Sequence, residues 1–439
     1  MSCSLLPLRP TAARLAPAIV LLAVAACAAA APAAGAAWRL ETIAGSDGVI
    51  ELHDLAFDVH GRGLLSWNGA ERDRARPFGA VAMRLPSGGW QRLPEITGVR
   101  PADAQIHAAA VRPLLVAREA ATTANRRRLV FADARPGGEF GAVAALDDFV
   151  TAHWSAANDA GSAIVAWTSE RSPFLRVAER AAGEPFAAAR ELAVGQVAAV
   201  AINARGDRVL AWRAGRRLAA RVRPAGGEWG DTARFGRITS VHGLRLSALM
   251  ARNGRAVVTW GATGRPCGAA VRNRAGRWRT RTVERRCGPS AAGHRAAPVL
   301  PVADGRGATY VAWTGRARSG RRAVKLARVG PGASRRPLVL SRERGAVLDD
   351  VAADPQRALA VTYAAPRPTR RNPLVVATYA AVRRAGASFG RARRLTPARF
   401  AARRGSRVAF HPLTGEPVVA VPFLIGLNVA VAAAVGPPG

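Results

Sequence analysis

From residue 52 to the C-terminus, short apolar runs alternate with turns that contain Gly or Asp, and the whole pattern recurs about every 45 to 50 residues. The second run of each copy is β-rich and usually ends in an aromatic residue. These runs read GLLSW (63–67), AIVAW (163–167), RVLAW (208–212), AVVTW (256–260), TYVAW (309–313) and LAVTY (359–363). Repeats of this length cannot bury their apolar faces alone, so the pattern predicts an array of packed β units.

Each full copy contains four β-like runs joined by tight turns, with almost no 3.6-residue periodicity, which is typical of one blade of a β-propeller. The second copy is the weakest, because LLVARE occupies the place of its aromatic run. The copies lie near 53–95, 106–147, 153–194, 198–238, 245–285, 297–341 and 348–397, with a partial one at 406–434.

The partial copy lacks a fourth run, and a matching run lies at the other end of the chain. WRLETIA (38–44) resembles the fourth runs GWQRLPEI (89–96) and RWRTRTVE (277–284), including the leading Trp. A strand from the N-terminus that completes the last blade would remove the open sheet edges that invite aggregation. Residues 38–439 are therefore predicted to be all-β and to form a single closed propeller of eight four-stranded blades. Seven blades are the alternative if weak copies merge.

The repeated aromatic residues hold one equivalent position in their units. This periodicity predicts that they pack between blades and do not form a ligand platform. They are Trp67, Trp167, Trp212, Trp260, Trp313 and Tyr363.

Residues 1–37 have a different composition. Arg9 and Arg14 precede an apolar stretch that is too short for a membrane span, and a small-residue run follows it, as in secretory signal peptides. Cleavage after this segment would release a soluble protein that begins near Trp38. Alternatively, Val24 to Cys27 resembles a lipobox, in which Cys27 is lipidated and anchors the protein to a membrane surface. Both routes predict a secreted or extracytoplasmic protein.

The formal charge is +36, and Lys325 is the only lysine. Arg-rich, Lys-poor composition is what a high-GC coding bias produces, and it leaves open whether the charge is functional. A surface this basic attracts anionic polymers, less so as salt rises. The expected partners are anionic envelope polymers or another envelope protein. Specific nucleic-acid recognition is not favoured, since the Trp residues are assigned to the core, and a monomer is expected.

Two cysteines remain in the mature domain, Cys267 and Cys287, and an oxidising compartment would favour a disulfide between them. They flank one predicted hairpin. Pairing about its turn sets Cys267 opposite Val283, so Cys287 has to curl back to reach it.

The chain resembles the broad class of exported bacterial β-propellers with degenerate repeats, on the pattern of its repeats alone. The G-H…W-D marks of WD40 repeats are absent, and Asp159, Gly161 and Trp167 do not have the spacing of a sialidase box. No G-x-S-x-G, H-E-x-x-H, Walker-type loop or C-x-x-C pattern occurs. The standard hydrolase, zinc-protease and nucleotide sites are therefore unsupported.

Three histidines and one aspartate fall at related places in their units. His53 and His153 lie 14 residues before their Trp, Asp349 lies 14 before Tyr363, and His107 lies 10 before Ala117 in the shortened unit. First strands line the channel of a propeller, so these side chains are expected at one channel mouth. There they could hold a divalent metal or an anionic ligand, with binding that depends on pH near 6.5. The alternative is a solvated polar rim.

Axial histidines on a propeller are similar to those of the carotenoid-cleaving oxygenases, but the long insertions of that family are missing here. No cofactor is expected beyond the divalent metal considered above. The sequence therefore favours a non-catalytic binding or scaffold propeller. The alternative is an extracytoplasmic enzyme, a metal-assisted hydrolase or lyase, working at the channel mouth.

Overall fold

The computed structural model describes residues 38–437 apart from short gaps, and residues 1–37, with Cys27 and the predicted signal segment, lie outside the described residues. The gaps within 38–437 are 44–48, 71–76, 86–87, 95–100, 108–111, 120–126, 136–138, 239–242, 263, 274, 288–297, 318, 331–332, 334–335, 355, 357, 368–374, 397–400, 403–404 and 426–427. No helix in the described part is long and apolar enough to cross a membrane.

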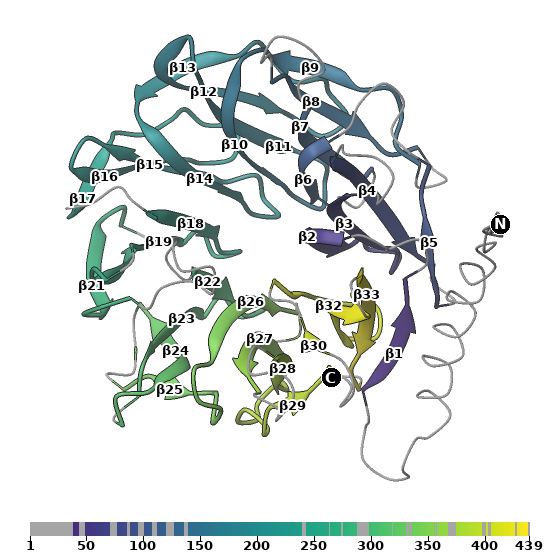
Figure 1. Ribbon diagram of the computed structural model, residues 1–439. Helices are drawn as coiled ribbons and strands as arrows, with labels where there is room; N and C mark the ends of the chain where they lie inside the picture. The colour runs from purple at the N-terminus through teal and green to yellow at the C-terminus, as the bar shows by residue number, and fades with distance from the viewer. Residues whose placement is uncertain are drawn as a thin grey trace, which may run out of the picture.

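Eight antiparallel blades form a ring, as the repeats predict (Figure 1). Each blade has four strands, with the first at the centre of the ring. Blades 1 to 4 are β2 (Val49–Phe57), β3 (Gly63–Ala70), β4 (Pro77–Arg84) and β5 (Trp90–Arg92); β6 (Pro101–His107), β7 (Leu114–Glu119), β8 (Leu129–Asp133) and β9 (Ala144–Asp147); β10 (Val150–Ala157), β11 (Ala163–Ser169), β12 (Ser172–Arg180) and β13 (Arg190–Val194); β14 (Gln196–Ile202), β15 (Arg208–Ala214), β16 (Arg217–Arg223) and β17 (Ala233–Arg237).

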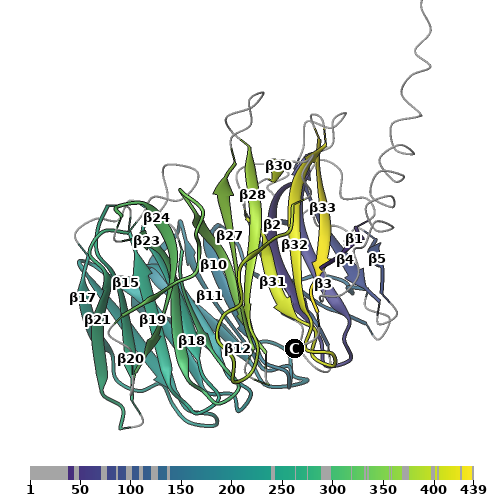
Figure 2. The ribbon, with the colours of Figure 1, turned by 90° about the horizontal axis from the view of Figure 1, so that it is seen from below.

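The second half of the chain builds four more blades in the same order. Blades 5 to 8 are β18 (Arg245–Met250), β19 (Ala256–Gly261), β20 (Cys267–Arg272) and β21 (Trp278–Glu284); β22 (Val299–Ala303), β23 (Thr309–Arg316), β24 (Arg322–Val329) and β25 (Leu338–Val339); β26 (Val347–Ala353), β27 (Leu359–Pro366), β28 (Val376–Arg383) and β29 (Arg393–Arg394); β31 (Arg407–Phe410), β32 (Pro417–Ile425), β33 (Asn428–Val435) and β1 (Arg39–Thr42). Strands run between the two faces of the ring (Figure 2).

The N-terminal strand closes the ring, as predicted. β1 pairs antiparallel with β33, from Arg39 opposite Val435 to Thr42 opposite Ala432. Glu41 on β1 then reaches blade 1, where its carboxylate accepts a 2.7 Å bond from Arg84 Nε and a 3.2 Å bond from Trp90 Nε1. A short strand, β30 (Ala401–Ala402), also pairs with both β28 and β32 and so joins blade 7 to blade 8.

The repeated aromatic residues are buried between blades, as predicted: five are at most 2% exposed, and Trp260 is 8% exposed. Several are capped by a carboxylate from the outer strand of the preceding blade. Asp147 accepts from Trp167 Nε1 at 2.6 Å. Glu284 accepts from Trp313 Nε1 at 3.3 Å and from Lys325 Nζ at 2.7 Å, so the lone lysine is a buried partner of the core.

In several of the described blades the turn after the first strand is held by a side-chain oxygen, whereas in blade 8 it is held by His411 Nδ1. In blade 3, Asn158 Oδ1 accepts from the backbone N–H groups of Ala160 and Ser162, while Gly161 adopts φ = 91°, a left-handed conformation that Gly tolerates best. The amide Nδ2 of the same Asn158 donates to Asn203 O in blade 4 at 3.0 Å. Equivalent amides continue this stitching: Asn203 donates to Ala251 O and Asn253 to Gly307 O.

Cys267 and Cys287 form the expected disulfide, with their Cα atoms 5.6 Å apart. The predicted register of this hairpin is off by one residue, because a bulge between Cys267 and Gly268 places Cys267 opposite Glu284 and not Val283. Both cysteines are buried in the apolar cluster between blades 5 and 6.

Substitutions at Asn158 should separate the turn cap from the link between blades. Asn158→Asp keeps the oxygen that caps the turn but replaces the donor to Asn203 O with a second oxygen. The free energy of unfolding should therefore fall by about 1–3 kcal/mol. Asn158→Ala loses both functions and should cost at least as much. Urea unfolding measures both, with the exposed Asp159→Asn as control. Equal stability of wild type and Asn158→Asp would contradict a role for the inter-blade bond.

Candidate functional site

The predicted channel residues lie on four of the inner strands but not at one register. His53 and Asp349 are equivalent, because each is the extra residue of a bulge, in β2 and β26 respectively. His153 on β10 lies directly opposite Trp167. His107 is the last residue of β6 and pairs with Leu114, so the sequence offset from Ala117 does not place it level with the others.

Asp349 and its neighbour Asp350 bind the backbone of the next blade. The carboxylate of Asp349 accepts bonds from Gly405 N at 3.3 Å and from Ser406 Oγ at 2.9 Å. Asp350 accepts a 3.0 Å bond from Val408 N of β31. Both carboxylates are thus engaged in holding blade 8 against blade 7.

One guanidinium faces this acidic group. Arg407, at the start of β31, donates from Nε to His53 O at 2.8 Å and interacts electrostatically with Asp54, Asp349 and Asp350. Asp54 accepts from its neighbour Leu55 N at 2.9 Å and from the backbone of the following inner strand, β6. The resulting acid–arginine cluster, Asp54, Asp349, Asp350 and Arg407, contains three carboxyl groups and one compensating charge.

The carboxyl groups of this cluster resist ionisation. Burial raises the pKa of Asp54 to about 6, although Arg407 lowers it, and the nearby Asp350 adds to the increase. Burial likewise raises the pKa of Asp349 to about 6 against the hydrogen bond from Ser406. The pKa of Asp350 is also raised by burial. A carboxyl group in such a place binds a proton at mildly acidic pH.

His107 belongs to a separate polar group on β6 and β10. Gln105 Oε1 accepts from Ser155 N at 2.8 Å and from Ser155 Oγ at 2.6 Å. Because the serine proton points to Gln105, His107 Nε2 supplies the proton in its 2.7 Å contact with Ser155 Oγ. Burial, with His153 and Arg180 nearby, lowers the pKa of His107 to about 4. His107 is therefore neutral at pH 6.5, so its protonation does not fall in the pH range near 6.5 in which ligand binding was predicted to change.

The described residues of the channel do not form a set of metal ligands. Within the ranges that the structure describes, no three His, Cys, Asp or Glu side chains gather closely enough to hold a metal ion. Of the predicted channel-mouth residues, Asp349 belongs to the acid–arginine cluster, and His53 contributes its backbone carbonyl to that cluster. His107 lies in the separate group, with His153 near enough to influence its pKa.

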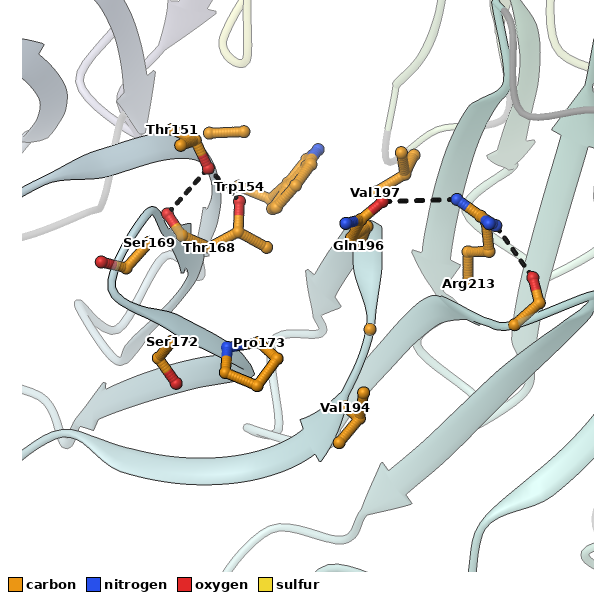
Figure 3. A pocket seen from close by; sticks show the side chains of 13 residues that line it. Thr151, Trp154, Thr168, Ser169, Ser172, Pro173, Val194, Gln196, Val197 and Arg213 are labelled. Atoms are coloured by element: carbon orange, nitrogen blue, oxygen red, sulfur yellow. Dashed lines mark hydrogen bonds between the residues drawn. The ribbon is translucent and has the colours of Figure 1, made fainter.

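A pocket of about 520 Å³ opens between blades 3 and 4 (Figure 3). The pocket lies where β10, β12 and β14 begin and where β11, β13 and β15 end. We call this side of the ring the entry face and the pocket the entry-face pocket. Its lining residues are Thr151, Ala152, Trp154, Thr168, Ser169, Ser172, Pro173, Val194, Gly195, Gln196, Val197, Arg213 and Gly215.

Several polar groups of the entry-face pocket are held by hydrogen bonds, to neutral partners at Thr151, Thr168 and Arg213 and to the carboxylate of Glu191 at Ser172, at 3.2 Å. Thr151 and Thr168 join their hydroxyl groups at 2.7 Å (Figure 3). Arg213 donates from Nε to Gly215 O at 2.9 Å and from Nη1 to Gln196 Oε1 at 3.4 Å. Among the described residues no carboxylate pairs with Arg213, so its charge is not neutralised at the pocket. The half-buried Trp154 adds an aromatic surface.

The backbone of the entry-face pocket is unusual. Val197 lies in a bulge of β14 with φ = 51°, a conformation that β-branched residues rarely adopt and that commonly marks functional sites. Gly195 precedes this bulge, and a Cβ there would lie 2.4 Å from Trp212 Cδ1, so only Gly fits against the core Trp. The chain is thus bent tightly where the pocket opens.

Sequence reasoning missed the entry-face pocket. Trp154 lies on an inner strand, away from the periodic aromatic position, and Arg213 directly follows the periodic Trp212; both were visible signals. The bulge at Val197 has no sequence signal of its own. For Asp54, Asp350 and Arg407 the decisive partners lie on neighbouring blades.

No family model and no curated protein matches the chain. Among solved structures, it is similar to an ulvan lyase of a polysaccharide lyase family, with a TM-score of 0.51 and 11% identity over 91% of this chain and 96% of that one. It also matches puromycin hydrolase, with a TM-score of 0.47 and 15% identity, over 90% of this chain and 62% of that one. AofleA from Arthrobotrys oligospora gives a TM-score of 0.40 and 10% identity over 72% and 93%. These likenesses show the propeller fold alone.

The raised pKa values of Asp54 and Asp349 predict that these two carboxyl groups add stability as the pH falls from 7 towards 4, because their folded pKa near 6 exceeds the ordinary aspartate pKa of 3.8 and the folded state therefore holds their protons more tightly. The lowered pKa of His107 acts in the opposite direction over the same range, so the two contributions are separated by substitution. Each carboxyl should contribute roughly 1–3 kcal/mol to the change.

Urea unfolding at several pH values measures this effect in Asp54→Asn and Asp349→Asn, which keep an acceptor oxygen. As the pH falls from 7 to 4, both variants should lose stability relative to wild type, because each lacks one carboxyl group with a raised pKa, and Asp159→Asn should match wild type. Unchanged slopes in all three variants would contradict the raised pKa values.

Proposed function

We propose that the protein acts outside the cytoplasm as a non-catalytic propeller that binds an acidic polysaccharide in the entry-face pocket. The observation that carries the proposal is the lining of this pocket. Sugar rings present hydroxyl groups and apolar C–H faces, and the pocket offers threonine and serine hydroxyls, an amide at Gln196 and the indole of Trp154. Its volume of about 520 Å³ lies in the range of small-molecule sites.

Arg213 gives the pocket its preference for acidic sugars. A guanidinium can bind the carboxylate or sulfate group of such a sugar through two parallel hydrogen bonds, and here it is oriented by Gly215 and Gln196 without losing its charge. The formal charge of +36 would add a long-range attraction for the same polymers. The pocket would then select acidic sugars among the anionic polymers, which the long-range attraction of the net charge does not distinguish.

The state of the channel carboxylates supports binding without catalysis. The carboxylates of Asp349, Asp350 and Asp54 each accept a hydrogen bond from a backbone N–H group. Through such bonds they join neighbouring blades. Export is supported by the disulfide between Cys267 and Cys287, since such bonds persist in oxidising compartments. Mass spectrometry of the mature product would test export, and an intact Met1 would contradict it.

Binding of an acidic oligosaccharide should depend on Trp154 and Arg213. With oligogalacturonate as probe, Arg213→Gln should weaken binding about tenfold, as expected for loss of a charge-assisted hydrogen bond pair. Trp154→Ala should also weaken it. Isothermal titration at fixed ionic strength measures both effects, and alginate and chondroitin sulfate extend the panel.

The matched control is Arg216→Gln, which removes an exposed arginine three residues away that does not line the pocket. It should bind like wild type. Carboxyl-reduced oligogalacturonate should lose the advantage that Arg213 provides. If Arg213→Gln and Arg216→Gln weaken binding equally, general charge attraction alone explains it and the proposal fails.

A further inference from the structure

A second pocket, of about 510 Å³, lies between the same two blades on the opposite face of the ring. It is formed where β11, β13 and β15 begin and where β12 and β16 end, so it is separated from the entry-face pocket by the length of the strands. We call it the arginine pocket. Its charged lining residues are Glu179, Arg180, Arg190, Arg205, Arg208 and Arg223.

Two of these arginines are already neutralised. Arg180 forms a bidentate pair with Asp133, with N–O distances of 2.9 and 2.8 Å. Arg205 pairs with Asp207 at 2.7 Å. They fix the walls of the arginine pocket but leave it no surplus charge.

The other three arginines share one carboxylate. Glu179 Oε2 accepts from Arg190 Nη2 and Arg223 Nη1, each at 2.6 Å, and Glu179 Oε1 lies 3.5 Å from Arg208 Nε. Three positive charges against one negative charge leave a surplus of two at the centre of the pocket. Such a surplus in a partly buried site attracts a ligand of opposite charge.

Arg208 is the member most in need of a further partner. The residue is only 8% exposed, and in the described structure its Nε makes no hydrogen bond, although Glu179 Oε1 lies 3.5 Å away as an ion-pair partner. Nη2 makes only a long 3.5 Å contact with Arg180 O. Burial lowers the pKa of Arg208, Glu179 raises it, and the neighbouring Arg223 and Arg190 lower it further.

We propose that the arginine pocket binds the phosphate group of a small phosphorylated molecule. A phosphate monoester carries close to two negative charges at neutral pH and offers three acceptor oxygens, which matches the surplus of two and the forked donors of Arg190, Arg208 and Arg223. The volume of about 510 Å³ exceeds that of one phosphate group, so the pocket has room for the molecule that carries it. Glu179 lines the same space and opposes the anion, which sets a limit on affinity.

Titration calorimetry with inorganic phosphate and with glucose 6-phosphate tests this proposal at constant ionic strength. Arg190→Gln and Arg223→Gln should each lower the affinity for both probes about tenfold. Arg190 is 44% exposed as a side chain, so its substitution should leave the fold intact, which circular dichroism checks. Glu179→Gln should strengthen binding because it removes the opposing carboxylate.

The controls separate a site from general attraction. Arg279→Gln removes an exposed arginine on β21 of blade 5, and Arg213→Gln alters only the entry-face pocket; both should bind phosphate like wild type. Binding of glucose 6-phosphate should weaken below about pH 6, where the phosphate monoester dianion is protonated, while sulfate binding should not. Equal loss in Arg190→Gln and Arg279→Gln, or no calorimetric binding by wild type, would overturn the proposal. This outcome is independent of oligosaccharide binding.

Discussion

The structure depends on closing a ring whose eight blades each need a neighbour on both sides. β1 supplies the outermost strand of the last blade, and Glu41 then ties that strand to Arg84 and Trp90 of the first. Without this pairing blade 8 would keep an open edge and the aromatic wedge between blades 8 and 1 would be exposed to water. Closure therefore joins segments from the two ends of the described chain, β1 and β33, in one blade.

The two halves of the ring are stitched by different polar devices. From blade 3 to blade 6, the side-chain amides of Asn158, Asn203 and Asn253 each donate a hydrogen bond to a backbone carbonyl in the corresponding turn of the next blade. Around the closure, charged residues on the inner strands take over, with Asp350 bonded to β31 and Arg407 bonded to β2. The carboxylates of Asp349 and Asp350 accept hydrogen bonds from blade 8 and so help to join it to blade 7.

The repeats allowed prediction of the parts of the fold that recur. The periodic aromatic position and the split last blade follow from repeat spacing, since each blade must place its wedge at the same depth. The disulfide was predicted separately, from the two cysteines that flank one hairpin. The site residues do not recur. His107 has the right residue type, but it is the last residue of β6 and pairs with Leu114, whereas Ala104 is the residue opposite Ala117. Val197 and Arg407 gain their roles from a bulge and from a neighbouring blade, and neither can be read from a single sequence.

The burial of Lys325 against Glu284 and Trp313 has a consequence for the whole surface. Apart from seven histidines, which are neutral in alkali, every other basic side chain is a guanidinium, which keeps its proton up to about pH 12. The protein is thus the macromolecular counterpart of a strong-base ion exchanger, whose fixed charge does not respond to alkali. Release of an anion from its surface is then controlled by salt and by the acidity of the anion itself.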